Sequence, residues 1–156
     1  MDQYATVDLF LRTLWTDPRL AYRSASEGGC FSNPWQPEGE MSFDGTPEGQ
    51  IWTPGVAIMN EDMPQKTLYS SWYVYPSGFI WWAKKVQVRV KCNFDFQYLP
   101  YDNQTCPIRL IGWRDVAHDI TFHFRDNGPV GNLNGRTEGM SAEWSITGID
   151  ERRANP

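Results

Sequence analysis

Hydrophobic and polar residues alternate along two stretches of the chain. Over residues 7–12, one face of an extended segment carries aliphatic side chains and the other carries an aromatic and two charged ones: Val7, Leu9 and Leu11 against Asp8, Phe10 and Arg12. Residues 82–92 repeat the pattern, with Trp82 and three valines on one face and mainly basic side chains on the other. Lys84 is an exception on the apolar face. A period of two predicts half-buried antiparallel strands at both places.

Strand-like composition recurs at four further places, at residues 66–74, 105–112, 119–124 and 143–149. The turn residues Tyr75-Pro76-Ser77-Gly78 lie between two aromatic-rich strands, so residues 66–92 are predicted to form one long hairpin. Two segments rich in Gly, Pro and Asn, 24–50 and 125–140, are predicted to be long loops of the kind that bind ligands or move. The pattern predicts an all-β sandwich with Greek-key-like connections.

Length and charge narrow the function classes. The 156 residues favour a single domain spanning 1–156, and 40% hydrophobic residues, with eight Trp, suffice for one core. A net charge of −5 argues against a basic nucleic-acid surface. A mean hydropathy of −0.55 argues against a membrane-embedded chain. The first residues have neither the basic region nor the apolar run of a signal peptide, so we expect a cytosolic protein or one whose leader precedes Met1.

The sequence contains three cysteines. Cys92 and Cys106 enclose thirteen residues. A disulfide closing a loop of that size would stabilise the fold by roughly 3 kcal/mol. Two free, buried thiols in a cytosolic domain fit the spacing equally well. Cys30 lies in the first long loop without an evident partner and is expected to be a free or loop-specific thiol.

Residues 92–106 resemble the signature loop of the Cys-loop receptors, the pentameric ligand-gated ion channels. The shared pattern is C-x-F-x-F-x-x-L-P-x-D-x-x-x-C, with Leu99 in place of the usual aromatic residue. Four more segments resemble the family in the same order along the chain, and the first is similar to the glycine- and GABA-receptor branch: 10–22, 51–60, 78–82 and 106–113. In the second of these, Gly55 replaces an aspartate. The five segments are spread along the chain between residues 10 and 113.

The resemblance implies an immunoglobulin-like antiparallel β-sandwich with a Cys92–Cys106 disulfide. It also implies that the loop between the cysteines, with Leu99, Pro100 and Asp102, couples ligand binding to pore opening. Compared with the family, the domain would be truncated at both ends. An N-terminal helix, a hairpin carrying the loop that caps the ligand, and four transmembrane helices would lie outside these residues.

The family's ligand sits between two subunits, and the resemblance assigns residues to both faces. On the principal face, Trp113 matches the aromatic residue that binds an amine by cation–π attraction, and Met59 falls where an aromatic or small residue is usual. On the complementary face, Phe10 would be an aromatic wall and Arg12 a carboxylate anchor, because a guanidinium offers a fixed fork of donors. Two further positions of the complementary face hold a hydroxyl residue and a second cation in the glycine-receptor branch. In this sequence they are Ala83 and Lys85. The residues alone also allow Trp113 to be a core tryptophan and Arg12 a solvated strand residue.

Other candidate sites are few. Asn103-Gln104-Thr105 is an N-glycosylation sequon, which would imply a secreted or surface protein. His118 and His123 fall on opposite faces of a predicted strand, so no metal site is expected. The acidic residues Glu38, Glu40, Asp44 and Glu48 are expected to form a solvated loop rather than a carboxylate pair of an enzyme. No cofactor is expected.

The resulting hypothesis is the extracellular neurotransmitter-binding domain of a pentameric channel. It would bind a small amine or amino acid within a homo- or hetero-pentamer at the outer side of the cell membrane, and it would not be an enzyme. One alternative is a soluble relative without a pore. The other is a carbohydrate-binding β-sandwich in which three tryptophans form a stacking platform: Trp72, Trp81 and Trp82.

Overall fold

The computed structural model describes residues 3–23, 28–29, 39–98, 100–114 and 120–123. The regular secondary structure of these residues is β-strand apart from one short 3-10 helix, η1 (Pro18–Leu20). The strands are β1 (Tyr4–Thr16), β2 (Met41–Asp44), β3 (Val56–Ile58), β4 (Lys66–Val74), β5 (Phe79–Lys91) and β6 (Leu110–Gly112). The chain divides into two units, residues 1–111 and 112–156. The expected all-β fold class is confirmed.

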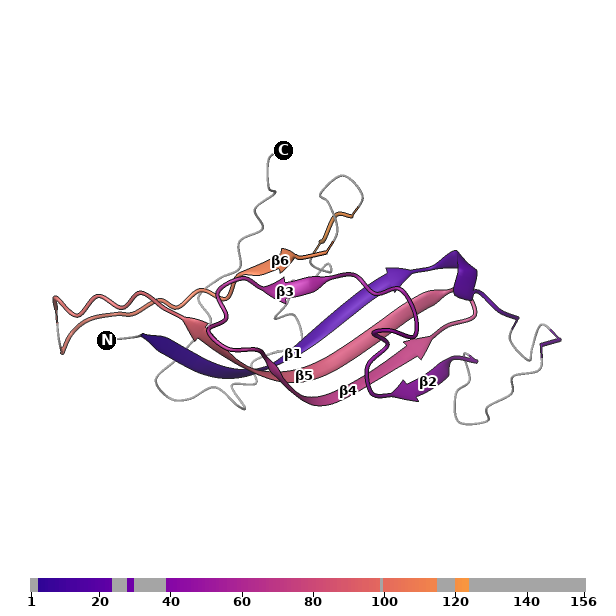
Figure 1. The fold of residues 1–156 in the computed structure, drawn as a ribbon, viewed down its shortest axis with the longest axis horizontal. Helices are drawn as coiled ribbons and strands as arrows, with labels where there is room; N and C mark the ends of the chain where they lie inside the picture. Colours follow the sequence, from indigo (N-terminus) through magenta and orange to yellow (C-terminus); the bar gives the residue numbers. More distant parts are fainter. Residues whose placement is uncertain (1–2, 24–27, 30–38, 99, 115–119, 124–156) are drawn as a thin grey trace. The chain divides into compact units, whose positions relative to one another are not determined.

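Four strands form one antiparallel sheet in the order β1-β5-β4-β2, and β3 pairs with β6 in a second, two-stranded sheet (Figure 1). The predicted hairpin over residues 66–92 is confirmed as β4 and β5. Residue 10 pairs with residue 85 and residue 12 with residue 83 across β1 and β5. This register places two segments that are far apart in sequence side by side.

The core lies on one face of the four-stranded sheet. Burial alternates along β1 and β5, which confirms the period of two in both stretches. The buried residues form two clusters, one around Ile58 of β3 and one around the tryptophans of the β4–β5 hairpin: Ile58, Val88, Val90 and Cys92, then Trp72, Val74, Ile80 and Trp82. Lys84 lies on the same inward face of β5 and is buried with them.

The β4–β5 turn is held by the chain segment that follows β1. Gly78 has a positive φ of 79°, and its carbonyl accepts a hydrogen bond from the Asp17 amide at 2.9 Å. The Asp17 carboxylate caps η1 by accepting from the Arg19 amide at 3.0 Å, and it pairs with the Arg19 guanidinium at 2.7 Å. The Arg19 side chain, as the main cause, lowers the pKa of Asp17. The Trp-x-Asp-x-Arg pattern in residues 15–19 therefore has a structural role, because its Asp17 caps η1 and binds the β4–β5 turn.

Three sequence predictions about strands and loops need correction. Within the predicted strand 105–112 only 110–112 is a strand, since Pro107 offers no N–H and the side chain of Asn60 binds the backbone there instead. Residues 120–123 of the predicted strand 119–124 are not in a strand. The predicted loop 24–50 contains β2, because Phe43 stacks on Trp72 of β4 with ring centroids 4.2 Å apart. The predictions for 125–140 and 143–149 lie outside the described residues.

Candidate functional site

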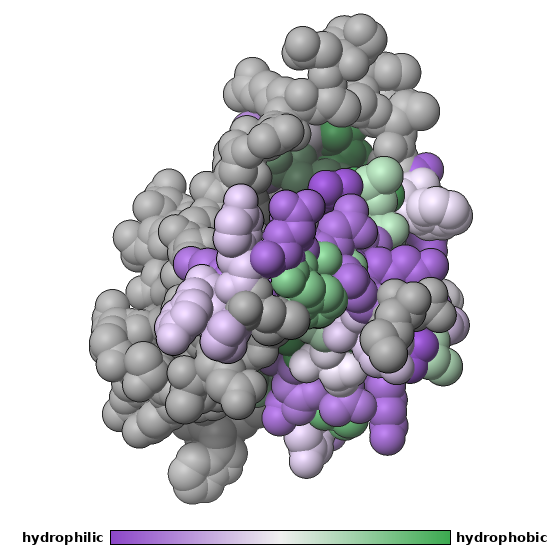
Figure 2. Space-filling model, turned by 90° about the vertical axis from the view of Figure 1, so that its left-hand side faces the viewer, coloured by the Kyte–Doolittle hydropathy of each residue, from purple (hydrophilic) through white to green (hydrophobic). Residues whose placement is uncertain are grey.

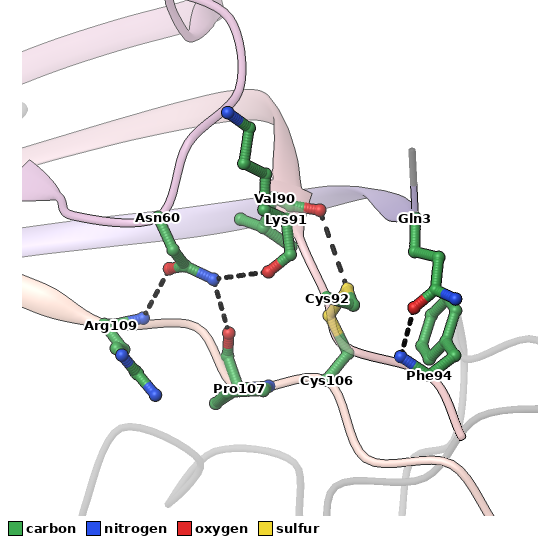
Figure 3. The surroundings of a disulfide bond; sticks show 9 residues. All are labelled: Gln3, Asn60, Val90, Lys91, Cys92, Phe94, Cys106, Pro107 and Arg109. Carbon is green, nitrogen blue, oxygen red and sulfur yellow. Dashed lines mark hydrogen bonds between the residues drawn. A yellow bond between two sulfur atoms is a disulfide. The ribbon is translucent and has the colours of Figure 1, made fainter. Parts of the chain in front are cut away.

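A disulfide joins Cys92 and Cys106, with Cα atoms 5.1 Å apart. The pairing implied by the family resemblance is therefore confirmed. Cys92 is part of the Ile58 cluster and Cys106 packs against it, so the bond ties the disulfide loop to the core. The amide of Phe94 donates to the side-chain oxygen of Gln3, which connects the start of the loop to the residue before β1 (Figure 3).

On the other side of the disulfide, the side chain of Asn60 connects the backbone on both sides of the two cysteines (Figure 3). Its side-chain amide donates to the carbonyl oxygens of Lys91, at 3.1 Å, and Pro107, at 2.8 Å, and its side-chain oxygen accepts from the Arg109 amide at 3.0 Å. One side chain thus joins the segment after β3, the end of β5 and the segment before β6. Sequence reasoning placed Asn60 in a motif but did not identify this role.

The disulfide loop itself projects from one end of the sheet (Figure 1). Gln104 holds its two limbs together, since its side chain accepts from the Asp95 amide at 2.9 Å and donates to the Asp95 carbonyl oxygen. Within its own limb, Gln104 also donates to the Asp102 carboxylate. Pro100 and Asn103 are exposed, and Leu99 lies outside the described residues. Figure 2 views this end of the molecule, where hydrophilic side chains surround an apolar area.

The four residues assigned to the complementary face lie together on the outward face of β1 and β5. Phe10 is opposite Lys85, and Arg12 is opposite Ala83. Phe10 is 67% exposed, and the Lys85 ammonium lies 5.8 Å from the centroid of its ring. The alternation in the sequence was sufficient to place Phe10 and Arg12 on one face, but the register with β5 required the structure.

The two cations of this face differ in their partners. The Lys85 ammonium lies 3.8 Å from the carboxylate of Asp8, which also accepts from the side chain of Gln87 at 3.0 Å. The Arg12 guanidinium lies 6.0 Å from the ring centroid of Trp81 and has no ion pair in the described part of the chain. Among the described residues, Arg12 therefore has no acidic partner, whereas Lys85 is partly neutralised by Asp8.

The two residues assigned to the principal face are both exposed. Met59 follows β3 directly, is 63% exposed, and donates its backbone amide to the Arg109 carbonyl at 2.7 Å. Trp113 comes directly after β6 and is 77% exposed. It belongs to the second unit. The interpretation of Trp113 as a core tryptophan is therefore wrong.

The carbohydrate-platform alternative is not supported by the placement of its tryptophans. Trp72 and Trp82 are opposite each other on the inward face and are both buried in the core. Trp81 points to the opposite face, where its ring lies 5.3 Å from that of Tyr73. The three rings do not form a common exposed surface, so the prediction that they form a sugar-stacking platform is wrong.

Within the described residues, the other sequence candidates form no second site. Among the described residues, no three metal-ligating side chains come together, and His118 lies outside them. Asp44 and Glu48 are exposed, as expected of a solvated acidic segment, but Glu40 is half-buried and one of its carboxylate oxygens is buried, which the prediction missed. Glu38 lies outside the described residues. In the described part of the chain, no helix has the length and apolar character needed to cross a bilayer.

Together, these observations define an antiparallel β-domain with a disulfide-closed loop and an outward row of aromatic and cationic side chains. The neurotransmitter-gated ion-channel ligand binding domain family matches residues 1–154 of the chain. The chain belongs to this family.

Individual relatives come from two branches of receptors. The gamma-aminobutyric acid receptor subunit rho-2 of Homo sapiens is 28% identical over 130 residues, which is 81% of this chain and 26% of that protein. The neuronal acetylcholine receptor subunit beta-4 of Bos taurus is 23% identical over 158 residues, 99% of this chain and 29% of that protein. The chain thus spans less than a third of the length of these relatives.

Proposed function

We propose that the chain is the extracellular ligand-binding domain of a pentameric ligand-gated channel. It binds a small amine or amino acid at the interface between two like subunits and transmits binding to a pore. The outward row of β1 and β5 is the observation that carries the proposal, because it gathers Phe10, Arg12 and Lys85 on one exposed face.

Arg12 is the carboxylate anchor of the proposed site. Its guanidinium has no ion pair in the described residues, and a planar fork of donors matches two carboxylate oxygens. Trp113 of a neighbouring copy supplies the aromatic face for the ligand's amine. Met59 is the second residue assigned to the principal face. Ala83 leaves space opposite Arg12 without adding a hydrogen bond.

The partners and the location follow from the same proposal. Relatives named receptor subunits support assembly with like subunits in a homo- or hetero-pentamer at the cell membrane. A disulfide suits the oxidising extracellular side. Pro100 and Asp102, with Leu99, carry the signal in the disulfide loop, whose limbs are linked through the Gln104 side chain.

Substituting Arg12 tests the proposed chemistry. A charge-assisted hydrogen bond contributes about 1.5–3 kcal/mol, so Arg12→Ala is expected to weaken γ-aminobutyrate binding roughly ten- to a hundredfold. Propylamine, the same molecule without its carboxylate, is expected to bind unchanged. Arg12→Lys should recover only part of the loss, because an ammonium lacks the planar fork. Competition binding on membranes carrying the assembled receptor measures all three.

The exposed residue Lys66, changed to Ala, is the matched control for loss of one positive charge from the same sheet. If Arg12→Ala affects γ-aminobutyrate and propylamine equally, Arg12 does not bind a carboxylate and the amino-acid site is refuted.

Asn103 is the proposed attachment site for an N-linked glycan. Both Asn103 and Thr105 are exposed in the disulfide loop, as the modifying enzyme requires. Protein secreted from eukaryotic cells should lose mass on treatment with peptide N-glycosidase F, whereas Asn103→Gln protein should not. Thr105→Ser, which keeps the sequon, should retain the glycan. An unmodified wild-type protein would contradict the assignment.

A further inference from the structure

Lys85 lies between an anion and a second cation on the outward face of β1 and β5. Three consecutive opposite pairs follow one another along this face: Asp8 with Gln87, Phe10 with Lys85, and Arg12 with Ala83. The diagonal neighbours of Lys85 on β1 are therefore Asp8 on one side and Arg12 on the other. Diagonal neighbours in an antiparallel pair lie about 7–8 Å apart, which is within reach of long side chains.

The two cations of this face have their contacts on opposite sides. The Lys85 ammonium lies 3.8 Å from the Asp8 carboxylate, which also accepts a hydrogen bond from the Gln87 side chain at 3.0 Å. The Arg12 guanidinium lies 6.0 Å from the ring centroid of Trp81, its diagonal neighbour on the side away from Lys85. In the described part of the chain, Arg12 forms no ion pair. The face therefore offers one paired and one unpaired cation.

This charge arrangement distinguishes ligands by their number of carboxylates. A ligand with one carboxylate needs one free cation, and Arg12 supplies it. A second carboxylate on the same small molecule would come within reach of Lys85, whose ammonium already faces Asp8. The second carboxylate would be repelled by that side chain, and like charges placed side by side are an effective means of excluding a wrong partner.

We infer that Asp8 is a specificity-determining residue: by pairing with Lys85, it makes the proposed ligand site favour a ligand with one carboxylate over a dicarboxylate. This inference rests on the function proposed above and names the class of ligand that the site takes. Asp8 belongs to none of the residues that the family resemblance assigned to the site, and only the register between β1 and β5 brings it to Lys85.

Glutamate and γ-aminobutyrate are a matched pair of ligands for the test, because glutamate is γ-aminobutyrate with one added carboxylate. Asp8→Asn removes the negative charge, keeps the shape of the side chain and retains an oxygen that can accept from Gln87. Competition of both ligands against radiolabelled γ-aminobutyrate, on membranes carrying the assembled receptor, gives the ratio of their affinities. Asp8→Asn is expected to shift this ratio about three- to tenfold towards glutamate, since partly exposed charge pairs have modest effects.

Two further variants make the result specific. Asp44→Asn removes an exposed acidic residue from β2 of the same sheet and should keep the wild-type ratio. Asp8→Asn combined with Lys85→Gln should return the ratio to about the wild-type value, because the ammonium released by the first change is then absent. This double variant shows whether Asp8 acts through Lys85.

An unchanged ratio in Asp8→Asn, or a shift that persists when Lys85 is also replaced, would overturn the inference. The response of γ-aminobutyrate and propylamine to Arg12→Ala separates this result from a failure of the proposed function. If those two ligands respond as expected, an unchanged ratio contradicts only the role of Asp8. If they respond equally, the proposed site is refuted and the role of Asp8 with it.

Discussion

Ala83, Lys84 and Lys85 are consecutive in β5 but serve different faces of the sheet. Ala83 and Lys85 point outward beside Arg12 and Phe10, whereas Lys84 points into the core. The alternation of the sequence was sufficient to assign these faces and to identify Lys84 as an exception. It could not show that Asp8 partly neutralises Lys85, because that contact depends on the register between β1 and β5.

Lys84→Met is expected to stabilise the chain at pH 7. A lysine whose side chain is largely buried and forms no ion pair among the described residues is replaced by an apolar side chain of similar volume, so we expect a gain of about 1 kcal/mol. Burial lowers the pKa of Lys84 in the folded state, so the cost of the charge is complete below that lowered pKa and disappears as pH rises towards the unfolded value.

The advantage of Lys84→Met over wild type should therefore shrink as the pH is raised towards 10.4, the usual lysine pKa. Urea midpoints at several pH values measure this difference, with Lys66→Met as the control for an exposed lysine. A variant that is less stable than wild type at neutral pH would show that the ammonium has a stabilising partner.

At the scale of the elements, the β4–β5 hairpin was predictable from its turn residues, but what holds the turn was not. Pro76, Ser77 and Gly78 are recognisable turn chemistry within the chain itself. The Asp17 amide bound to the Gly78 carbonyl comes from a segment some sixty residues earlier, so the contact appears only in the folded chain. The short strand β2 was missed for a similar reason, because its four residues are defined by pairing with β4.

Gly78→Ala is expected to destabilise the fold by about 2 kcal/mol or more. The residue has a φ of 79°, which costs an L-residue about 1–2 kcal/mol, and an added Cβ would lie 2.5 Å from the Asp17 carbonyl oxygen. Gly45→Ala is the matched control, since Gly45 has a φ of 86° but open space around a Cβ. Urea unfolding of both variants measures the difference.

A smaller loss for Gly78→Ala than for Gly45→Ala would show that the Asp17 contact does not constrain the turn. The comparison isolates the contact between elements from the local backbone preference, because both glycines have positive φ.

At the scale of the whole molecule, membership of the ligand-binding domain family could be predicted because five short motifs occur in the right order. Much of what those motifs do is structural: Asp17 caps η1, Asn60 links three segments and the cysteines tie their loop to the core. The candidate ligand residues were assigned through the resemblance. The structure adds that the complementary ones share a face and that Ala83 and Lys85 are half-buried there, whereas Phe10, Arg12, Met59 and Trp113 are exposed.

The central claim is that one site is built from two copies, with Arg12 of one copy and Trp113 of the next. Mixing two defective variants tests it most directly. Arg12→Ala and Trp113→Ala should each abolish high-affinity γ-aminobutyrate binding when expressed alone. Both side chains are exposed, so neither change should disturb folding.

Expressed together in equal amounts, the two variants should recover about a quarter of the wild-type number of sites, at wild-type affinity. Random assembly of a head-to-tail ring leaves about that fraction of interfaces with both residues intact. Binding of radiolabelled γ-aminobutyrate to the co-expressed receptor gives the number and affinity of sites. If no site is recovered, Arg12 and Trp113 do not meet across an interface, and the shared-site account is contradicted.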